Sequence, residues 1–322
     1  MTGYFHGKRI VVTGGSGFLG RCLVRILRER KPRAIVVPRR ADCDLRLEEN
    51  IFRLLDDARP DILFHLAATV GGIGANADNP GRFFYDNMAM GLHLIEGARR
   101  YQALQKLIMV GTVCSYPKHT PIPFREADLW NGFPDESNAP YGIAKRALFT
   151  MAQAYRAQYD LKSICVIPAN LYGPGDNFDL KTSHVIPALI RKFIAAKESG
   201  APSVSVWGTG QVTREFLYVE DAAAGLILAA ERYDDADPVN LGTGTEIRIL
   251  DLVFLIKRLV GYEGEVFWDT TRPDGQPRRQ LDTQAAALFG FQARTTLEEG
   301  LRKTIGWYCE NYCRTVPLEA RS

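Results

Sequence analysis

Two side chains that could transfer a proton lie one helical turn apart near the middle of the chain. Tyr141 and Lys145 open a predicted helix over residues 141–159, with Pro140 near its first turn. Because residues i and i+4 share one face of a helix, the phenol and the ammonium group are neighbours. A free phenol has a pKa of about 10, and a nearby ammonium group lowers it by stabilising the phenolate. The pair could therefore act as an acid–base group; the alternative is a tyrosine and a lysine on the surface.

A hydroxyl and a thiol follow the predicted strand over residues 106–111. Thr112 comes directly after this strand, and Cys114 comes two residues later. Ligands of open α/β sheets bind at the carboxyl ends of the strands, so Thr112 is placed to hydrogen-bond a substrate carbonyl. Residues i and i+2 of an extended chain point to the same face, so Cys114 could join it. The alternative for Cys114 is a buried structural cysteine.

A glycine-rich turn lies near the start of the chain. Residues 13–20 read TGGSGFLG and connect a predicted strand over residues 9–13 to a predicted helix over residues 21–30. Glycines allow a tight turn and a close approach of backbone N–H groups to a pyrophosphate, which the helix N-terminus also attracts. The motif predicts a dinucleotide-binding site. Its candidate residues are Gly14, Gly17, Phe18, Leu19 and Gly20, with Ala67 at the end of the third predicted strand.

The residues after the second predicted strand, residues 34–37, favour NADP(H) as the dinucleotide. Sites for NAD usually carry an acid at this point, whereas this strand runs into Arg39 and Arg40. Two guanidinium groups suit the 2′-phosphate that distinguishes NADP from NAD. The alternative is that both arginines are solvated and that Asp42 or Asp44 binds the ribose.

Short apolar strands alternate with helices through the first half of the chain. This pattern is typical of a parallel sheet that is covered on both faces. We therefore predict an α/β fold, namely a doubly wound parallel sheet (Rossmann) with a smaller mixed α/β substrate domain. The other predicted elements are strands at residues 61–67, 163–168 and 265–268, and helices at residues 47–58, 80–101, 186–196, 222–232 and 250–260.

The alternation breaks after residue 170, which suggests a change of domain. Turn residues cluster at 173–177, and a basic loop is predicted over residues 272–279. We predict that the NADP-binding domain covers residues 1–170 and 215–240. We predict that the substrate domain covers residues 171–214 and 241–322.

Composition limits the class of protein. The 322 residues are 46% hydrophobic and 24% charged, which excludes a disordered chain. The net charge of +3 and the lack of a long basic run give no sign of a nucleic-acid partner. The longest apolar stretch has about nine residues, whereas a membrane span needs roughly 18, and no signal peptide is apparent. The six cysteines lack metal-ligand spacing, so we expect no metal site and a reducing, cytoplasmic location.

Several short stretches of the chain match one enzyme family. With the glycine turn and the Tyr141–Lys145 pair, they make the chain resemble the extended short-chain dehydrogenase/reductase family over nearly its whole length. Within that family the resemblance is to enzymes that epimerise and reduce GDP-4-keto-6-deoxy-D-mannose. The matching stretches are residues 70–73 (VGGI), 114–118 (CSYPK), 138–141, 170–174, 176–178, 183–189 (SHVIPAL), 206–210 (VWGTG) and 214–221.

The resemblance implies a reaction on a GDP-sugar, with inversion at C3 and C5 followed by NADPH-dependent reduction of the C4 ketone. It implies that Tyr141 donates a proton to O4, with Lys145 as its activator and Thr112 as a hydrogen-bonding hydroxyl. It also implies that Cys114 is the epimerisation base and that His184 is the epimerisation acid and a cofactor contact. The implied substrate-binding residues are Asn170, Lys192, Trp207, Arg214, Asp274 and Arg279.

Other functions are compatible with the same motifs. A related enzyme could act on another GDP-sugar, of heptose or colitose type, or could reduce C4 without epimerising. A nucleotide-sugar 4-epimerase would retain NAD and would need neither Cys114 nor His184. A non-catalytic protein on this fold would commonly lack Tyr141 or Lys145, and this chain has both.

The resemblance also implies a homodimer. In this family the helices predicted at residues 80–101 and 141–159 form a four-helix interface between two subunits. Met88, Leu92 and Ile95 could serve that interface or the core of a single subunit.

Overall fold

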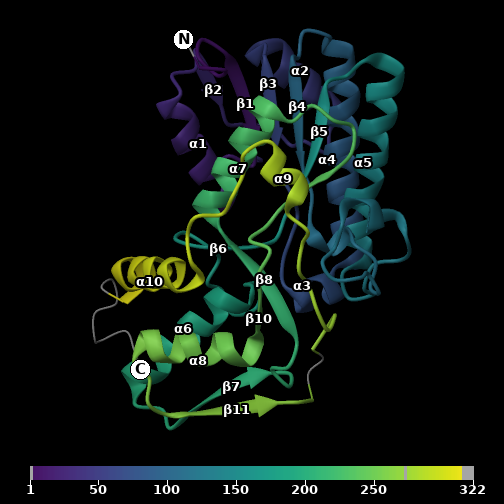
Figure 1. Ribbon diagram of the computed structural model, residues 1–322. Helices are drawn as coiled ribbons and strands as arrows, with labels where there is room; N and C mark the ends of the chain where they lie inside the picture. Colours follow the sequence, from purple (N-terminus) through teal and green to yellow (C-terminus); the bar gives the residue numbers. More distant parts are fainter. Residues whose placement is uncertain (1–2, 272–273, 314–322) are drawn as a thin grey trace.

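The largest element of the fold is a six-stranded parallel sheet (Figure 1). The computed structural model describes residues 3–271 and 274–313. The strand order is β2-β1-β3-β4-β5-β9. The sheet therefore grows from β1 to β2 on one side, and from β3 through β4 and β5 to β9 on the other. This arrangement confirms the predicted doubly wound sheet, whose ligand crevice lies where the order reverses. The strands are β1 Arg9–Thr13, β2 Ala34–Val36, β3 Ile62–His65, β4 Lys106–Val110, β5 Ser163–Pro168 and β9 Val239–Leu241.

Helices cover both faces of this sheet, which explains why its central strands are apolar on both sides. α1 packs against α7 on one face, and α2, α4 and α5 pack in a row on the other (Figure 1). Among the described residues, no helix is both long enough and apolar enough to cross a membrane. The helix bounds are α1 Phe18–Glu29, α2 Glu48–Ala58, α4 Pro80–Tyr101, α5 Ala139–Tyr159 and α7 Val219–Arg232.

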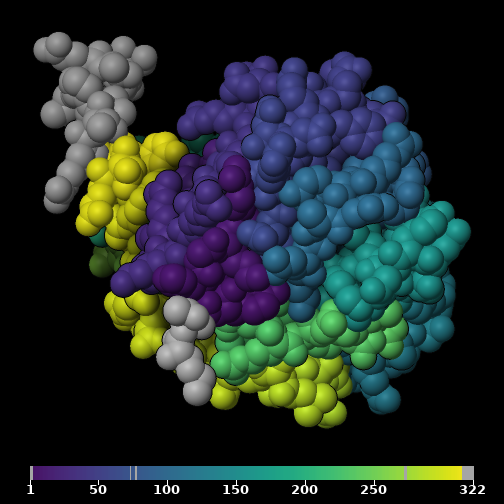
Figure 2. Space-filling model, turned by 90° about the horizontal axis from the view of Figure 1, so that it is seen from above, coloured from purple at the N-terminus to yellow at the C-terminus, as the bar shows by residue number. Residues whose placement is uncertain are grey.

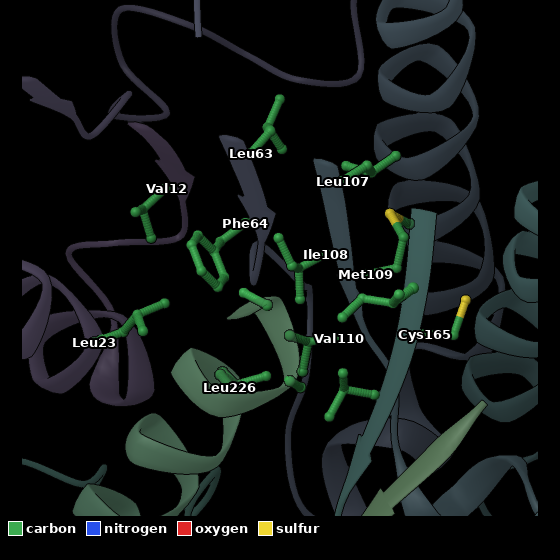
Figure 3. Close-up of a cluster of buried hydrophobic side chains, with 14 of the residues drawn as sticks. Val12, Leu23, Leu63, Phe64, Leu107, Ile108, Met109, Val110, Cys165 and Leu226 are labelled. Carbon is green, nitrogen blue, oxygen red and sulfur yellow. The ribbon is translucent and has the colours of Figure 1, made fainter. Parts of the chain in front are cut away.

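The main hydrophobic core lies on both faces of the large sheet, and one part of it fills the space between the sheet and the pair α1–α7. Val12, Phe64 and Ile108 are direct neighbours on adjacent strands. Leu23 of α1 and Leu226 of α7 lie against them, and all five side chains are buried (Figure 3). Burial of such side chains contributes about 1.5–3 kcal/mol each, so this core holds the strand ends in register.

A smaller layer of mixed α/β structure follows β5 and has its own hydrophobic core (Figure 1). It contains a three-stranded sheet, β10-β8-β6, and a two-stranded sheet, β11-β7. Three helices of this layer pack together around α8. Its elements are β6 Asn170–Tyr172, α6 Val185–Ser199, β7 Ser203–Trp207, β8 Thr213–Tyr218, β10 Glu246–Arg248, α8 Ile249–Val260, β11 Glu265–Asp269, α10 Leu297–Tyr308 and, directly after it, η3 Cys309–Cys313. The short helices elsewhere in the chain are α3 Ile73–Asp78, η2 Glu126–Trp130 and α9 Gln284–Leu288.

Some predictions differ from the structure, and one predicted loop lies partly outside the described residues. α1 begins at Phe18 rather than residue 21, because Gly17 ends the turn as the helix N-cap. We assigned residues 281–291 to the substrate domain, whereas Leu281, Phe289 and Phe291 pack in the main core because the chain returns beside β9. Within the predicted loop 272–279, residues 272–273 lie outside the described part of the chain, and the rest is irregular.

α5 approaches the end of β4 very closely. A Cβ atom on Gly142, in the first turn of α5, would overlap the carbonyl oxygen of Cys114 in η1 (Val113–Ser115). Ser115 Oγ also donates to the carbonyl oxygen of Gly142 at 3.2 Å. Only glycine permits this distance, so Gly142 sets the position of the start of α5, including Tyr141.

We predict that Gly142→Ala lowers the free energy of unfolding by about 1–3 kcal/mol, because the added methyl group must push α5 away from η1. Gly306→Ala in α10 is the matched control, since a Cβ there meets nothing within 4 Å. Alanine forms helix more readily than glycine, so the control should be unchanged or up to about 1 kcal/mol more stable. Urea unfolding followed by circular dichroism measures both, and equal stability of the two variants would contradict the close packing.

Candidate active site

A cleft of about 830 Å³ lies between the two layers, at the carboxyl ends of the parallel strands. The opposite end of the large sheet is covered by closely packed segments (Figure 2). Every residue predicted for the site lines the cleft except Arg39, which lines a neighbouring pocket beside α2. The residues brought together are Gly14, Gly17, Phe18, Leu19, Gly20, Arg40, Ala67, Thr112, Cys114, Tyr141, Lys145, Asn170, His184, Lys192, Trp207, Arg214, Asp274 and Arg279.

The glycine turn has the shape that a dinucleotide phosphate requires. Gly14 has a φ of +71°, and a Cβ there would lie 2.7 Å from the backbone nitrogen of Ala67. A Cβ on Gly20 would overlap the carbonyl oxygen of Gly14. The first turn of α1 has neither a side-chain cap nor an acidic residue, so its N–H groups remain available to an anion in the cleft.

The charges beside the turn favour a phosphate over a bare ribose. Arg46 donates to Asp44 through Nε at 3.0 Å and Nη2 at 2.6 Å, and these bonds lower the pKa of Asp44 to about 2. Arg46 also donates to the buried Asp86 at 3.1 Å. Asp42 lines the neighbouring pocket. Arg40 makes no ion pair within the described residues, so its charge is available to a phosphate in the cleft.

The predicted acid–base group forms a compact unit at the end of β4. Tyr141 is buried, and its hydroxyl is hydrogen-bonded to the Thr112 side chain. Lys145 Nζ donates to the carbonyl oxygen of Val110 at 3.1 Å. Burial lowers the pKa of Lys145 to about 8. The buried His65 lies close enough for the Lys145 charge to help lower the His65 pKa, after the larger effect of burial.

The pKa of Tyr141 moves in the direction opposite to our prediction. We expected the Lys145 ammonium group to lower it. Burial instead raises it, the nearby Cys114 adds to the increase, and the hydrogen bond from Thr112 only partly offsets both. The phenol therefore keeps its proton at neutral pH, which suits a proton donor.

Cys114 and His184 enter the cleft from different elements. Thr112 Oγ1 accepts a hydrogen bond from Cys114 N at 3.2 Å, and Cys114 Sγ accepts one from Arg279 Nη1 at 3.6 Å. His184 is the N-cap residue of α6, and its ring lines the cleft. Water in the cleft reaches this ring, but the surrounding protein lowers its pKa by desolvation. The cleft therefore contains a thiol close to Tyr141 and, elsewhere in its lining, a mainly neutral imidazole.

A second group of charged side chains lies at the other end of the cleft. Arg214 donates to the carbonyl oxygens of Thr213 at 2.7 Å, Gln276 at 2.6 Å and Asp274 at 3.2 Å. Burial and the neighbouring Arg279 lower the pKa of Arg214 to about 10. Two arginines in one wall of the cleft favour a doubly charged ligand such as a diphosphate.

The remaining predicted substrate residues surround these arginines. Lys192 Nζ lies 5.9 Å from the centre of the Trp207 ring and donates to the carbonyl oxygen of Ser205 at 2.9 Å. Trp207 is 56% exposed, so it is not a core residue. Asp274 accepts from Thr209 N and Oγ1, each at 2.8 Å, and Asn170 Nδ2 donates to the carbonyl oxygen of Glu215 at 2.9 Å. The Trp207 face and the cations form a surface that suits a planar ring attached to phosphates.

Sequence reasoning missed two buried polar residues of the cleft. Gln276 is 4% exposed and is bonded to both cleft arginines. Asp176 is 8% exposed, one of its carboxylate oxygens has no hydrogen-bond partner in the described structure, and burial raises its pKa to about 7. Asp176 lies in a turn and in one of the matching stretches, but neither feature indicated a buried carboxylate there, and a glutamine in a loop carries no sequence signal. The described residues contain no cluster of three or more histidines, cysteines or acids able to hold a metal ion.

Known proteins share this fold and much of this sequence. The sequence profile of the NAD dependent epimerase/dehydratase family matches residues 10–242. The chain belongs to this family. It is 40% identical over 305 residues to a GDP-L-fucose synthase of Sinorhizobium fredii, covering 95% of this chain and 96% of that protein.

Solved structures of this family superpose closely on the whole chain. A GDP-L-fucose synthetase from Naegleria fowleri bound to NADP has a TM-score of 0.86 and 30% identity, covering 95% of this chain and 93% of that one. A GDP-6-OMe-4-keto-L-xylo-heptose reductase from C. jejuni has a TM-score of 0.90 and 27% identity, covering 96% and 99%. Both layers of the fold, and so the cleft between them, belong to the shared architecture.

We predict that Lys145→Met raises the free energy of unfolding at pH 7 by about 1–3 kcal/mol. The folded-state pKa of about 8 is below the ordinary value of 10.5, so the folded protein carries a disfavoured charge at pH 7. This destabilisation is fully present below pH 8 and disappears as the pH rises towards the unfolded-state value. The gain in the free energy of unfolding over the wild type should therefore be large at pH 7 and small at pH 10. Chemical denaturation of both proteins at the two pH values measures it. A variant that is less stable than the wild type at pH 7 would contradict it.

Proposed function

We propose that this protein converts GDP-4-keto-6-deoxy-D-mannose into GDP-L-fucose, by epimerisation at C3 and C5 followed by NADPH-dependent reduction at C4. The observation that carries the proposal is the meeting of three groups in one cleft. A phosphate-binding turn with Arg40, the unit of Thr112, Tyr141 and Lys145, and a thiol and an imidazole all line the same cleft. Relatives named GDP-L-fucose synthase, matched over nearly the full chain, support the same substrate.

The residues suit the reduction of a ketone. NADP(H) would be held by the turn at Gly14, Gly17 and Gly20 and by Arg40, and when bound it supplies the hydride for C4. Tyr141 remains protonated at neutral pH, so it can donate its proton to O4, while Thr112 holds the same oxygen by a hydrogen bond. Lys145 lies one helical turn from Tyr141 on α5, and its positive charge would stabilise the negative charge that develops on the Tyr141 oxygen as the proton leaves.

The residues also suit epimerisation next to the ketone. The C4 carbonyl acidifies the hydrogens on C3 and C5. Cys114 would remove such a proton from one face of the sugar, and the electron pair of the C–H bond would move onto O4, where Thr112 and Tyr141 stabilise it. His184 would return a proton on the opposite face. In the same cleft, Lys192, Trp207 and Arg214 would hold the GDP part, with Asn170 and Asp274 as hydrogen-bonding partners.

The experiment is to incubate the protein with GDP-4-keto-6-deoxy-D-mannose and NADPH in D2O and to read the product by NMR. We expect NADPH oxidation and GDP-L-fucose with deuterium at both C3 and C5. Tyr141→Phe should lower the rate of reduction by about 10²–10⁴-fold, since it removes the proton donor, while exchange continues at a lower rate because Thr112 still holds O4. Cys114→Ala should abolish exchange, so that any product retains protium at C3 and C5.

Two outcomes would contradict the proposal in different ways. Reduction without exchange in the wild type would mean that the enzyme is a 4-reductase and that Cys114 and His184 are structural. Neither reduction nor exchange would exclude this substrate, and GDP-4-keto-heptoses would be tested next, because a heptose reductase shares the fold over 96% of this chain.

We predict that Arg40→Ser weakens NADPH binding by about tenfold or more and leaves NADH binding unchanged, because a charged hydrogen bond to a phosphate contributes about 1.5–3 kcal/mol. Arg39→Ser is the matched control, because Arg39 lies outside the cleft, and its effect should stay within about twofold. Fluorescence titration with both dinucleotides measures the four dissociation constants. Equal effects of the two substitutions would contradict the assignment of Arg40 to the phosphate.

We also propose that the protein is a cytoplasmic homodimer that pairs through α4 and α5. Ile95 is buried in the core, whereas Leu92 and Tyr85, seven residues apart on α4, are 40% and 63% exposed. Such a stripe of apolar side chains on an outer helix supports a partner surface. None of the six cysteines forms a disulfide, in keeping with a reducing compartment.

A further inference from the structure

We propose that Arg279 is a catalytic residue that stabilises the thiolate of Cys114, and that Gln276 is the positioning residue that holds Arg279 there. The inference rests on the proposed role of Cys114 as the base of epimerisation. It gives Arg279 a role at the reacting sulfur rather than at the diphosphate of the substrate. Its basis is a chain of hydrogen bonds that joins three separate segments at one side of the cleft.

Gln276 is the centre of this chain of bonds. Its Nε2 donates to the carbonyl oxygens of Lys118 at 2.8 Å and Pro117 at 3.3 Å, in the segment that follows η1. Its Oε1 accepts from Arg279 Nε at 2.8 Å, and its backbone oxygen accepts from Arg214 Nη1 at 2.6 Å. Every hydrogen-bonding atom of its side chain is therefore used. A residue bonded in this way fixes the rotamer of Arg279 relative to η1, which carries Cys114.

Arg279 directs its charge at the sulfur. It is 7% exposed, and its Nη1 lies 3.6 Å from Cys114 Sγ. Cys114 is the only ionisable group that it contacts within residues 3–271 and 274–313. Its other hydrogen-bond partner, Gln276 Oε1, is neutral. Against the effect of burial, hydrogen bonds from Ser137 and then the charge of Arg279 lower the pKa of Asp135, and burial followed by the Arg279 charge lowers the pKa of Arg214.

This geometry matches the first step of epimerisation. A thiol group must lose its proton before it can act as a base, and a contacting cation favours the thiolate. In the step itself, the proton moves from C3 or C5 of the sugar to Cys114 Sγ. The electron pair of the broken C–H bond moves onto O4, and the negative charge leaves the sulfur. Arg279 would thus stabilise the reactive form of Cys114, and Gln276 would keep the guanidinium group in contact with it.

The test uses the free protein and iodoacetamide, with alkylation of Cys114 followed by peptide mass spectrometry at pH 7. Iodoacetamide forms a C–S bond with the thiolate and releases iodide, so its rate follows the thiolate population. Arg279→Gln should slow alkylation by about tenfold or more. Arg278→Gln is the matched control, because Arg278 is the neighbouring residue, is exposed and pairs with Glu246. Its rate should stay within about twofold of the wild type.

Two further variants separate charge from position. Arg279→Lys keeps the charge and should retain a rate within about threefold of the wild type. Gln276→Leu keeps the charge but removes the acceptor for Arg279, and it should slow alkylation by about 3–10-fold. If Gln276→Leu does not fold, as judged by circular dichroism, the comparison of Arg279→Gln with Arg279→Lys still decides the proposal.

A second measurement distinguishes this role from phosphate binding. Under the proposal, the dissociation constant of GDP for Arg279→Gln stays within about threefold of the wild type. Unchanged alkylation together with a tenfold weaker affinity for GDP would overturn the proposal and assign Arg279 to the diphosphate. Because alkylation needs no sugar substrate, its outcome is independent of the deuterium experiment. A wild type that shows no exchange would refute the proposed function but would leave the Arg279–Cys114 interaction measurable.

Discussion

The contact between α5 and the end of β4 is the constraint on which the site depends. Because Gly142 has no side chain, the first turn of α5 rests directly on the carbonyl oxygen of Cys114. This contact brings the Tyr141 hydroxyl to Thr112 and the Lys145 ammonium group to the carbonyl oxygen of Val110. The helix therefore positions its acid–base pair by backbone packing, and the hydrophobic core behind the sheet keeps the strand ends in register for it.

The cleft concentrates positive charge that the described structure does not neutralise with contacting carboxylates. Lys145 and Arg214 are buried, and desolvation lowers the pKa of each. Arg279 is also buried, and its hydrogen-bond partners are Gln276 Oε1 and Cys114 Sγ. Buried cations destabilise a fold, and they are retained where an anion forms or binds. A diphosphate, an enolate and a thiolate are the anions that the proposed reaction needs, so the electrostatics and the chemistry point to the same conclusion.

Sequence periodicity predicted strands β1 to β5 of the large sheet, because buried strands appear as continuous apolar runs. It missed the sixth strand, β9, and also β6, β7, β8 and β10. Three of these strands have only three residues, and β7 is alternately exposed and buried. Sequence reasoning also assigned residues 281–291 to the wrong core, because the return of the chain to β9 is a long-range contact that local patterns do not encode. Short strands and chain returns depend on partners that are distant in sequence.

Residue types and spacing by themselves determined the chemistry available to this protein: a glycine turn, a phenol with a lysine one turn away, and a hydroxyl and a thiol at a strand end. Only the tertiary structure decided the state of each group. It buried Tyr141 so that its pKa rises where the spacing predicted a fall, and it turned Arg39 away from the cleft while Arg40 lines it. It also joined Gln276 and Arg279 to Cys114 across more than 160 positions of sequence. The reason is physical: spacing fixes which side chains share a face, whereas desolvation and electric fields depend on everything that packs around them.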